Sequence, residues 1–89
     1  MKPRVWVWVG SGDMRAFEGH LHAATLREVI RYLYTQDHHV LKRVGNEEGE
    51  LPRFVLTCVN EDDARTLNGA DTLLQERNEI RFILAIPNG

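Results

Sequence analysis

The chain has 89 residues, of which 43% are hydrophobic and 27% are charged, a composition typical of one small globular domain. Its 11 basic and 13 acidic residues are mixed along the sequence, so there is no basic stripe to follow a nucleic-acid backbone. No apolar segment approaches the ~20 residues that cross a bilayer, and the single Cys58 has no partner for an internal disulfide. We therefore expect one cytoplasmic domain, residues 1–89, that binds neither nucleic acid nor membrane.

The first two elements form a predicted β-hairpin. Residues 4–9 (RVWVWV) alternate valine with tryptophan, which is typical of a strand with two different faces. Residues 10–13 (GSGD) favour a turn, and residues 15–22 (RAFEGHLH) supply the returning strand, which Gly19 weakens. If the valines face a helix, Trp6 and Trp8 stand on the other face. The pattern alone also allows the reverse, with tryptophan in the core.

One main helix is predicted over residues 25–36. Thr25 and Glu28 have the T-x-x-E spacing of a capping box. The apolar residues that follow recur at helical spacing, namely Leu26, Val29, Ile30 and Leu33. Residues 36–50 are polar, although Val40, Leu41 and Val44 allow a short second helix.

The second half of the chain supplies the rest of the sheet. Residues 53–59 (RFVLTCV) and 79–86 (EIRFILAI) are predicted strands. Residues 60–63 and 68–71 favour turns, with room for one more short strand between residues 64 and 74. Because a helix separates the first strands from the last, a central pairing of the two ends must be parallel. This order predicts an α+β, β-grasp fold, in which a mixed sheet of about four or five strands packs on one main helix.

The histidines, the acidic run and Cys58 do not show the spacing of a metal site or an active site. His20 and His22 share one face of a predicted strand, but a metal site needs a third converging ligand. The acidic run at residues 61–63 is interpreted as a solvated loop. Cys58 has no histidine or aspartate at a motif spacing that would make it a nucleophile, so it is interpreted as a packing residue. We predict no metal site and no active site within the chain.

The C-terminal half, from Pro52 to Gly89, resembles the MoaD, ThiS and CysO sulfur carriers, which are ubiquitin-like proteins. The shared features are a strand ending in V-N, an acidic run, an arginine, a G-x-D-T-x-L segment, a turn before the last strand, and that strand. They lie at Val59-Asn60, Glu61-Asp62-Asp63, Arg65, Gly69 to Leu74, Asn78-Glu79-Ile80, and Ile83 to Gly89. Arg53-Phe54-Val55 is most similar to the CysO branch. Where the family closes on Gly-Gly, this chain has Asn88-Gly89 after Pro87.

The resemblance implies a protein substrate rather than an enzyme. The Gly89 carboxylate would be adenylated by a partner adenylyltransferase related to ubiquitin-activating enzymes, which uses ATP and Mg²⁺. It would then become a thiocarboxylate and deliver sulfur to a sulfur-accepting synthase subunit. Molybdopterin, cysteine, thiamin or a tRNA base would receive that sulfur, and the chain itself would bind no cofactor tightly. Residues 85–89 would form a flexible tail in which Ala85, Ile86, Pro87 and Asn88 extend into the partner.

The resemblance also implies a docking face on the sheet. We expect Val55, Thr57 and Val59 in the core, and a partner interface on the opposite face made by Trp6, Trp8, Phe54, Leu56, Arg81 and Ile83. Two alternatives stay open. The chain would be a protein modifier if Gly89 is joined to lysine, or a non-conjugating binding module if Asn88 marks a lost activity and only the face is used.

Overall fold

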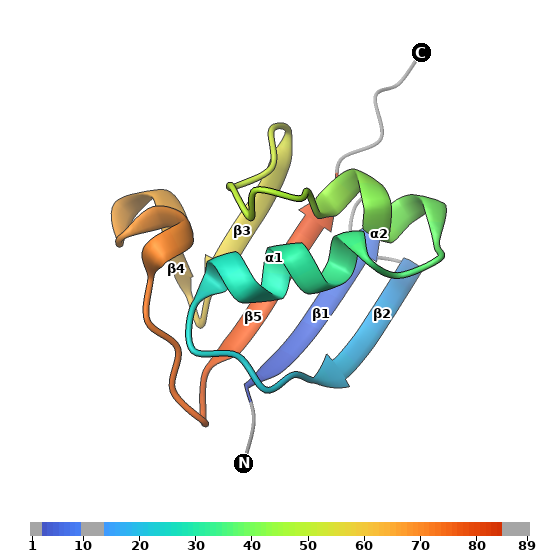
Figure 1. Ribbon diagram of the computed structural model, residues 1–89. Coiled ribbons are helices and arrows are strands. Elements are labelled where there is room, and N and C mark those ends of the chain that lie inside the picture. Colours follow the sequence, from blue (N-terminus) through green and yellow to red (C-terminus); the bar gives the residue numbers. More distant parts are fainter. Residues whose placement is uncertain (1–2, 10–13, 85–89) are drawn as a thin grey trace.

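The computed structural model describes residues 3–9 and 14–84, which form a mixed five-stranded sheet with its helices on one side (Figure 1). The strands are β1 (Arg4–Val9), β2 (Met14–His20), β3 (Val55–Val59), β4 (Asp62–Asp63) and β5 (Glu79–Leu84). The helices are α1 (Leu26–Tyr34) and α2 (His39–Val44), with short 3₁₀ turns η1 (Ala64–Thr66) and η2 (Gly69–Asp71). The strand order β2-β1-β5-β3-β4 confirms the predicted β-grasp fold.

The two end strands pair at the centre of the sheet. β1 and β5 run parallel, with Val5 opposite Ile80 and Val7 opposite Phe82. β2 joins the other side of β1, and β3 joins the other side of β5, both antiparallel. The predicted parallel pairing is therefore confirmed, and it follows from the crossover through the helical layer.

The capping box starts α1 where the sequence predicts it. The Thr25 hydroxyl accepts a hydrogen bond from the Glu28 N–H at 3.4 Å, and the Glu28 carboxylate accepts from the Thr25 N–H at 3.3 Å and from the Ala24 N–H. These contacts satisfy amide donors that the first turn of a helix leaves unpaired. From this start α1 turns its apolar stripe fully into the core through Leu26, Val29, Ile30 and Leu33.

The core lies between the helices and one face of the sheet. Val5 and Val7 are 0% exposed, whereas Trp6 and Trp8 are only half-buried on the opposite face. The remaining strand residues of the core are Val55, Thr57, Val59, Ile80, Phe82 and Leu84. Val5 and Val7 therefore face α1, as does the set of β3 residues expected in the core.

Several predicted limits were wrong, including the end of α1, which lies at Tyr34 rather than at residue 36. β2 ends at His20 rather than at residue 22, because the next amide bonds the Pro3 carbonyl and Pro3 has no N–H to continue the ladder. β3 begins at Val55 rather than at residue 53, because Phe54 has a left-handed backbone with φ of 59°. The extra short strand is β4 at Asp62–Asp63, whereas η1 and η2 occupy residues 64–66 and 69–71 of the segment where it was expected.

The helical layer contains a second, shorter helix. The predicted short helix that contains Val40, Leu41 and Val44 is confirmed as α2, and Gly45 is its C-cap. Within the described residues, no helix combines the length and the apolar character needed to cross a membrane.

Candidate functional site

The sheet face opposite α1, called the open face below, collects five of the six residues of the predicted interface, namely Trp6, Trp8, Leu56, Arg81 and Ile83. In Figure 1 α1 and α2 lie over the same side of the sheet. Cross-strand pairing arranges the other side in rows, because alternate residues of paired strands share a face. One row consists of Trp8, Ile83 and Leu56, and the next of Trp6, Arg81 and Cys58.

The row of Trp8, Ile83 and Leu56 is apolar. Leu56 is 44% exposed and the other two are half-buried. Trp6, Trp8, Arg81 and Ile83 line a shallow, open hollow of about 340 Å³ between β1 and β5. An apolar hollow edged by arginine is a surface that suits contact with another protein.

Two guanidinium groups lie over the ring of Trp6. The Arg4 Cζ is 5.1 Å from the centroid of the ring and the Arg81 Cζ is 5.6 Å from it. Arg81 also pairs with Glu79, with 3.3 Å between Nη2 and Oε2. Arg4 is absent from the interface predicted from the sequence, although its position two residues before Trp6 on one strand is the signal that could have found it.

Cys58 on the open face is not an activated nucleophile. Burial raises the pKa of its thiol, Asp63 and Asp62 raise it further, and Arg81 opposes them. The thiol is consequently protonated at neutral pH, in keeping with a packing role.

The sheet end that carries the apolar row is also where β5 leads into the tail. Leu84, the last described residue, is paired with Val55 on one side and with Val9 on the other. Ala85, Ile86, Pro87, Asn88 and Gly89 lie outside the described residues, and their predicted roles stay predictions. The residues that precede them belong to the central strand of the sheet, which fixes the point from which the tail starts.

Phe54 stands apart from the hollow. It is 86% exposed and precedes Val55 at the same sheet end as Leu84. Its φ of 59° is an outlier for a bulky residue. Phe54 was thus wrongly predicted as a strand residue, and an interface role for it stays a prediction.

We expect Phe54→Gly to be more stable than Phe54→Ala by about 1 kcal/mol, because a left-handed backbone is costly for every residue with a Cβ. Denaturant unfolding of both variants measures the difference. Both variants remove the exposed ring, so their comparison isolates the backbone. Equal stability, or a more stable alanine variant, would contradict the left-handed conformation.

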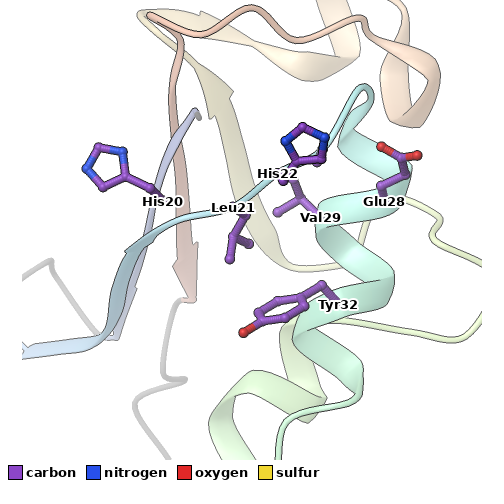
Figure 2. A pocket seen from close by; sticks show the side chains of 7 residues that line it. His20, Leu21, His22, Glu28, Val29 and Tyr32 are labelled. Atoms are coloured by element: carbon purple, nitrogen blue, oxygen red, sulfur yellow. The ribbon is translucent and has the colours of Figure 1, made fainter. Parts of the chain in front are cut away.

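A second hollow lies between the end of β2 and α1. It has a volume of about 320 Å³ and is lined by His20, Leu21, His22, Ala23, Glu28, Val29 and Tyr32 (Figure 2). His20 and His22 do not share a strand face, since β2 ends at His20, and Figure 2 shows their rings well apart. Glu28 is engaged in the capping box. In the part of the chain that the structure describes, no three His, Cys, Asp or Glu side chains are grouped to hold a metal ion.

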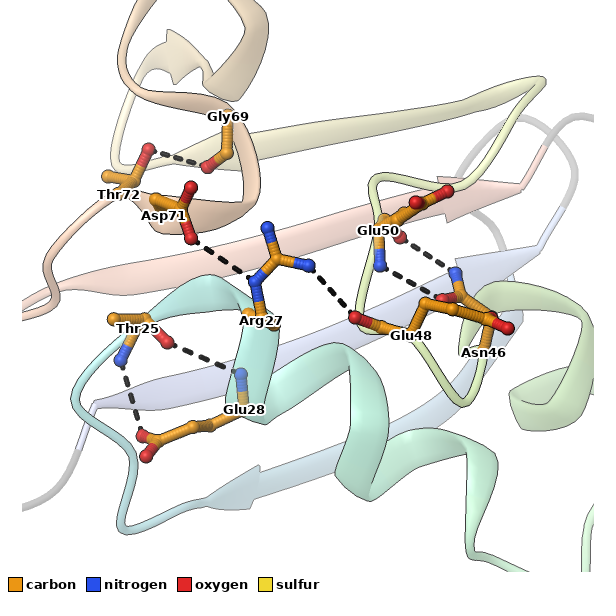
Figure 3. Close-up of polar contacts among 9 residues, drawn as sticks. All are labelled: Thr25, Arg27, Glu28, Asn46, Glu48, Glu50, Gly69, Asp71 and Thr72. Atoms are coloured by element: carbon orange, nitrogen blue, oxygen red, sulfur yellow. Dashed lines mark hydrogen bonds and ion pairs between the residues drawn. The ribbon is translucent and has the colours of Figure 1, made fainter.

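Motif residues that carry the family resemblance have structural roles. Asn60, with φ of 56°, closes the turn after β3, and its side-chain oxygen accepts from the Glu79 N–H at 2.9 Å. The Asp71 carboxylate accepts a hydrogen bond from Arg27 Nε at 3.1 Å, and Arg27 Nη1 donates one to the Glu48 carbonyl at 2.8 Å (Figure 3). Thr72 donates its hydroxyl to the Gly69 carbonyl at 2.7 Å. Asp71 therefore ties its loop to α1, whereas Asn60 links the turn after β3 to the start of β5.

Known proteins resemble this chain in structure. No protein-family model matches the sequence, and no curated protein matches it either. A chain of the Amycolatopsis orientalis BexX/CysO complex superposes with a TM-score of 0.65 and 22% identity, over 96% of this chain and 99% of that one. The Haloferax volcanii HVO 2177 protein superposes with a TM-score of 0.65 and 19% identity, over 98% of this chain and 87% of that one. Urm1 from Trypanosoma brucei superposes with a TM-score of 0.62 and 20% identity, over 97% of this chain and 95% of that one.

These likenesses span nearly the whole of each chain, and all lie below 25% identity. They therefore show that the fold is shared. This chain has the β-grasp fold.

Proposed function

We propose that the chain is a sulfur carrier, a protein substrate whose Gly89 carboxylate is activated by an adenylyltransferase and converted to a thiocarboxylate. The proposal rests on the β-grasp fold shared with the CysO complex together with the tail motif Ile83 to Gly89. The observation that carries it is the position of Leu84. The central strand ends there, at the apolar end of the open face, so a partner that docks on this face has the start of the tail within reach.

The chemistry needs only the carboxylate from this chain. A Gly89 oxygen attacks the α-phosphate of ATP, and pyrophosphate leaves to give an acyl-adenylate. Sulfide then attacks the acyl carbon, AMP leaves with the oxygen that joined it, and a thiocarboxylate remains. ATP and Mg²⁺ belong to the partner enzyme, which supplies the charge stabilisation for the leaving phosphates.

The tail departs from the family at one position. Asn88 stands where the family has glycine, and a side chain there adds bulk next to the reacting carboxylate. Asparagine tolerates unusual backbone angles better than most residues, so we propose that the tail is competent. Pro87 restricts φ and stiffens the approach.

The test is intact-mass measurement after incubation with ATP, Mg²⁺, a sulfide source and the adenylyltransferase of the same organism. We expect a mass gain equal to the exchange of one oxygen for sulfur, which is lost when Gly89 is deleted. An Asn88→Gly variant serves as the matched control for the tail. No gain in the native chain, with a gain in Asn88→Gly, would contradict the carrier function.

A binding module is the second candidate, and the half-buried tryptophans of the open face favour it. It predicts that deleting Asn88 and Gly89 leaves the affinity for the partner unchanged, while Trp8→Ala weakens it. A protein modifier differs only in the acceptor, and a mass gain corresponding to attachment to a lysine would identify it. The sulfur's destination, a synthase subunit in the biosynthesis of a cofactor, cysteine or a tRNA base, belongs to the same proposal, as does a cytoplasmic location.

A further inference from the structure

We propose that the outer edge of β2 is a self-association surface, through which two copies of this chain join antiparallel into one continuous sheet. β2 stands first in the strand order β2-β1-β5-β3-β4, so within residues 3–9 and 14–84 it is paired with a strand on one side only. The other side of an edge strand presents backbone N–H and C=O groups that a further strand can bind. β2 has 7 residues, whereas β4 at the opposite edge has 2.

A β-bulge gives β2 the same pattern of faces in both directions. The register with β1 shifts between Phe17 and Arg15, so that Ala16 is an extra residue. Ala16 and Phe17 pack against the core, whereas Arg15 and Glu18 stand opposite the tryptophans of β1 on the open face. From Arg15 to Glu18 the faces therefore read open, core, core, open.

This pattern selects one register for the second copy. An antiparallel strand keeps residues of like face together when Ala16 stands opposite Phe17 of the second copy, and this register places Arg15 opposite its Glu18. A shift by one residue would set Arg15 opposite Gly19 or Phe17, which are on the core face. A sheet with one buried face disfavours such a pairing, because it would turn charged side chains toward the core.

The charges at this edge are complementary in the selected register. Arg15 and Glu18 are both exposed and pair within one chain, with 2.6 Å between Nη1 and Oε1. Directly opposite residues of two strands have Cβ atoms about 5 Å apart. Each arginine would therefore stand between two glutamates, and each glutamate between two arginines, around the two-fold axis. The bulge makes this possible, because regular alternation places residues three apart on opposite faces.

The charges set the orientation of the two copies more than the affinity, since exposed ion pairs contribute little. The affinity comes from the main-chain hydrogen bonds of the joined strands and from Phe17. This ring is half-buried, and in the selected register it lies opposite the small side chain of Ala16 of the second copy. The edge is short, so we expect a weak dimer that forms as the protein concentration rises.

The proposed dimer leaves the candidate site uncovered. β1 separates β2 from β5 (Figure 1), so the contact does not involve the strand that ends at Leu84. Residues of like face stay together across the axis, and both open faces therefore lie on the same side of the joined sheet. Self-association and the proposed carrier function are thus independent of each other.

Analytical ultracentrifugation of the full chain at increasing concentrations tests the proposal. We expect the native chain to pass from monomer to dimer. Arg15→Glu leaves only acidic side chains around the axis and Glu18→Arg only basic ones, so each should weaken dimerisation about tenfold or more at low salt. The double variant Arg15→Glu with Glu18→Arg restores opposite charges across the axis and should dimerise like the native chain. An equimolar mixture of the two single variants should form a heterodimer.

Two controls accompany these variants. Arg53→Glu makes the same change in net charge as Arg15→Glu at an exposed position before β3, so it should dimerise like the native chain. Thermal unfolding checks that every variant is folded, which we expect because the lost ion pair is exposed. Amide hydrogen exchange locates the contact: exchange in β2 should slow as the dimer forms, while exchange in β4 at the other edge stays unchanged.

A native chain that stays monomeric would overturn the proposal, and the bulge would then be a device that protects the edge from pairing. Failure of the double variant to recover, or an equal loss in Arg53→Glu, would also overturn it, as would slower exchange in β4 instead of β2. None of these measurements involves the adenylyltransferase, so their outcome leaves the test of sulfur transfer unaffected.

Discussion

Phe82→Ala is expected to destabilise the domain by about 4 kcal/mol. Phe82 is 0% exposed on the central strand, with Val7 and Thr57 as its cross-strand neighbours and α1 above it. Truncating a buried phenylalanine removes its transfer free energy and leaves a cavity that neighbours fill only in part. A domain of this size has a total stability of about 5–10 kcal/mol, so the variant is left close to unfolding. Denaturant titration measures the loss.

The neighbouring residue supplies the control for this prediction. Ile83 lies on the open face of the same strand and is half-buried, so Ile83→Ala should cost much less stability. Phe82→Leu keeps most of the volume and should lose less than the alanine variant. A loss below about 1.5 kcal/mol in Phe82→Ala would show that the core is packed less tightly than the structure has it. Because Phe82→Ala leaves the domain little stability in reserve, it is unsuited to tests of binding.

Gly45→Ala is expected to destabilise the domain by about 3 kcal/mol, because the added Cβ would clash with the backbone of α1. Gly45 ends α2 with φ of −88°, so conformational freedom is not the reason. A Cβ at this position would meet the Tyr34 amide nitrogen and would lie 2.5 Å from the Ile30 carbonyl oxygen and 2.9 Å from the Tyr34 Cα. These atoms belong to α1 and its end and cannot rotate away, so α2 must move as a whole. Thermal or denaturant unfolding measures the effect.

Gly19→Ala is the matched control for the same substitution. A Cβ at Gly19 would lie 3.1 Å from the Phe17 Cζ, the far end of a side chain that can adjust. We expect a change of less than about 1 kcal/mol there, partly offset by the lower chain entropy of alanine in a strand. If both variants were equally stable, the close approach of Gly45 to α1 would be wrong.

The elements with strong local signals could be predicted from the sequence. The T-x-x-E spacing placed the start of α1 at Thr25, and the alternation of residues 4–9 gave the bounds of β1. Both signals are properties of neighbouring residues, which is why they can be read without the rest of the fold. The parallel pairing of β1 with β5 also followed, because a helical crossover permits no other direction.

Elements with weak local signals could not be predicted with the same success. β4 has only two residues, Asp62 and Asp63, which pair with the end of β3, and two residues are too few to show a strand pattern. β2 ends early because Pro3, at the other end of the hairpin, cannot donate a hydrogen bond. Phe54 gave no sign of its left-handed backbone, since phenylalanine rarely adopts one.

For the candidate site, the sequence by itself determined which residues share a face, because alternation along a strand separates the valines of β1 from its tryptophans. It could not determine which face is covered, since valine and tryptophan are both suited to a core. Only the tertiary structure decided this. The crossover places α1 over Val5, Val7, Ile80 and Phe82, and so leaves Trp6 beside Arg4 and Arg81 on the open face. Burial depends on the element that packs above a strand, and that element comes from another part of the chain.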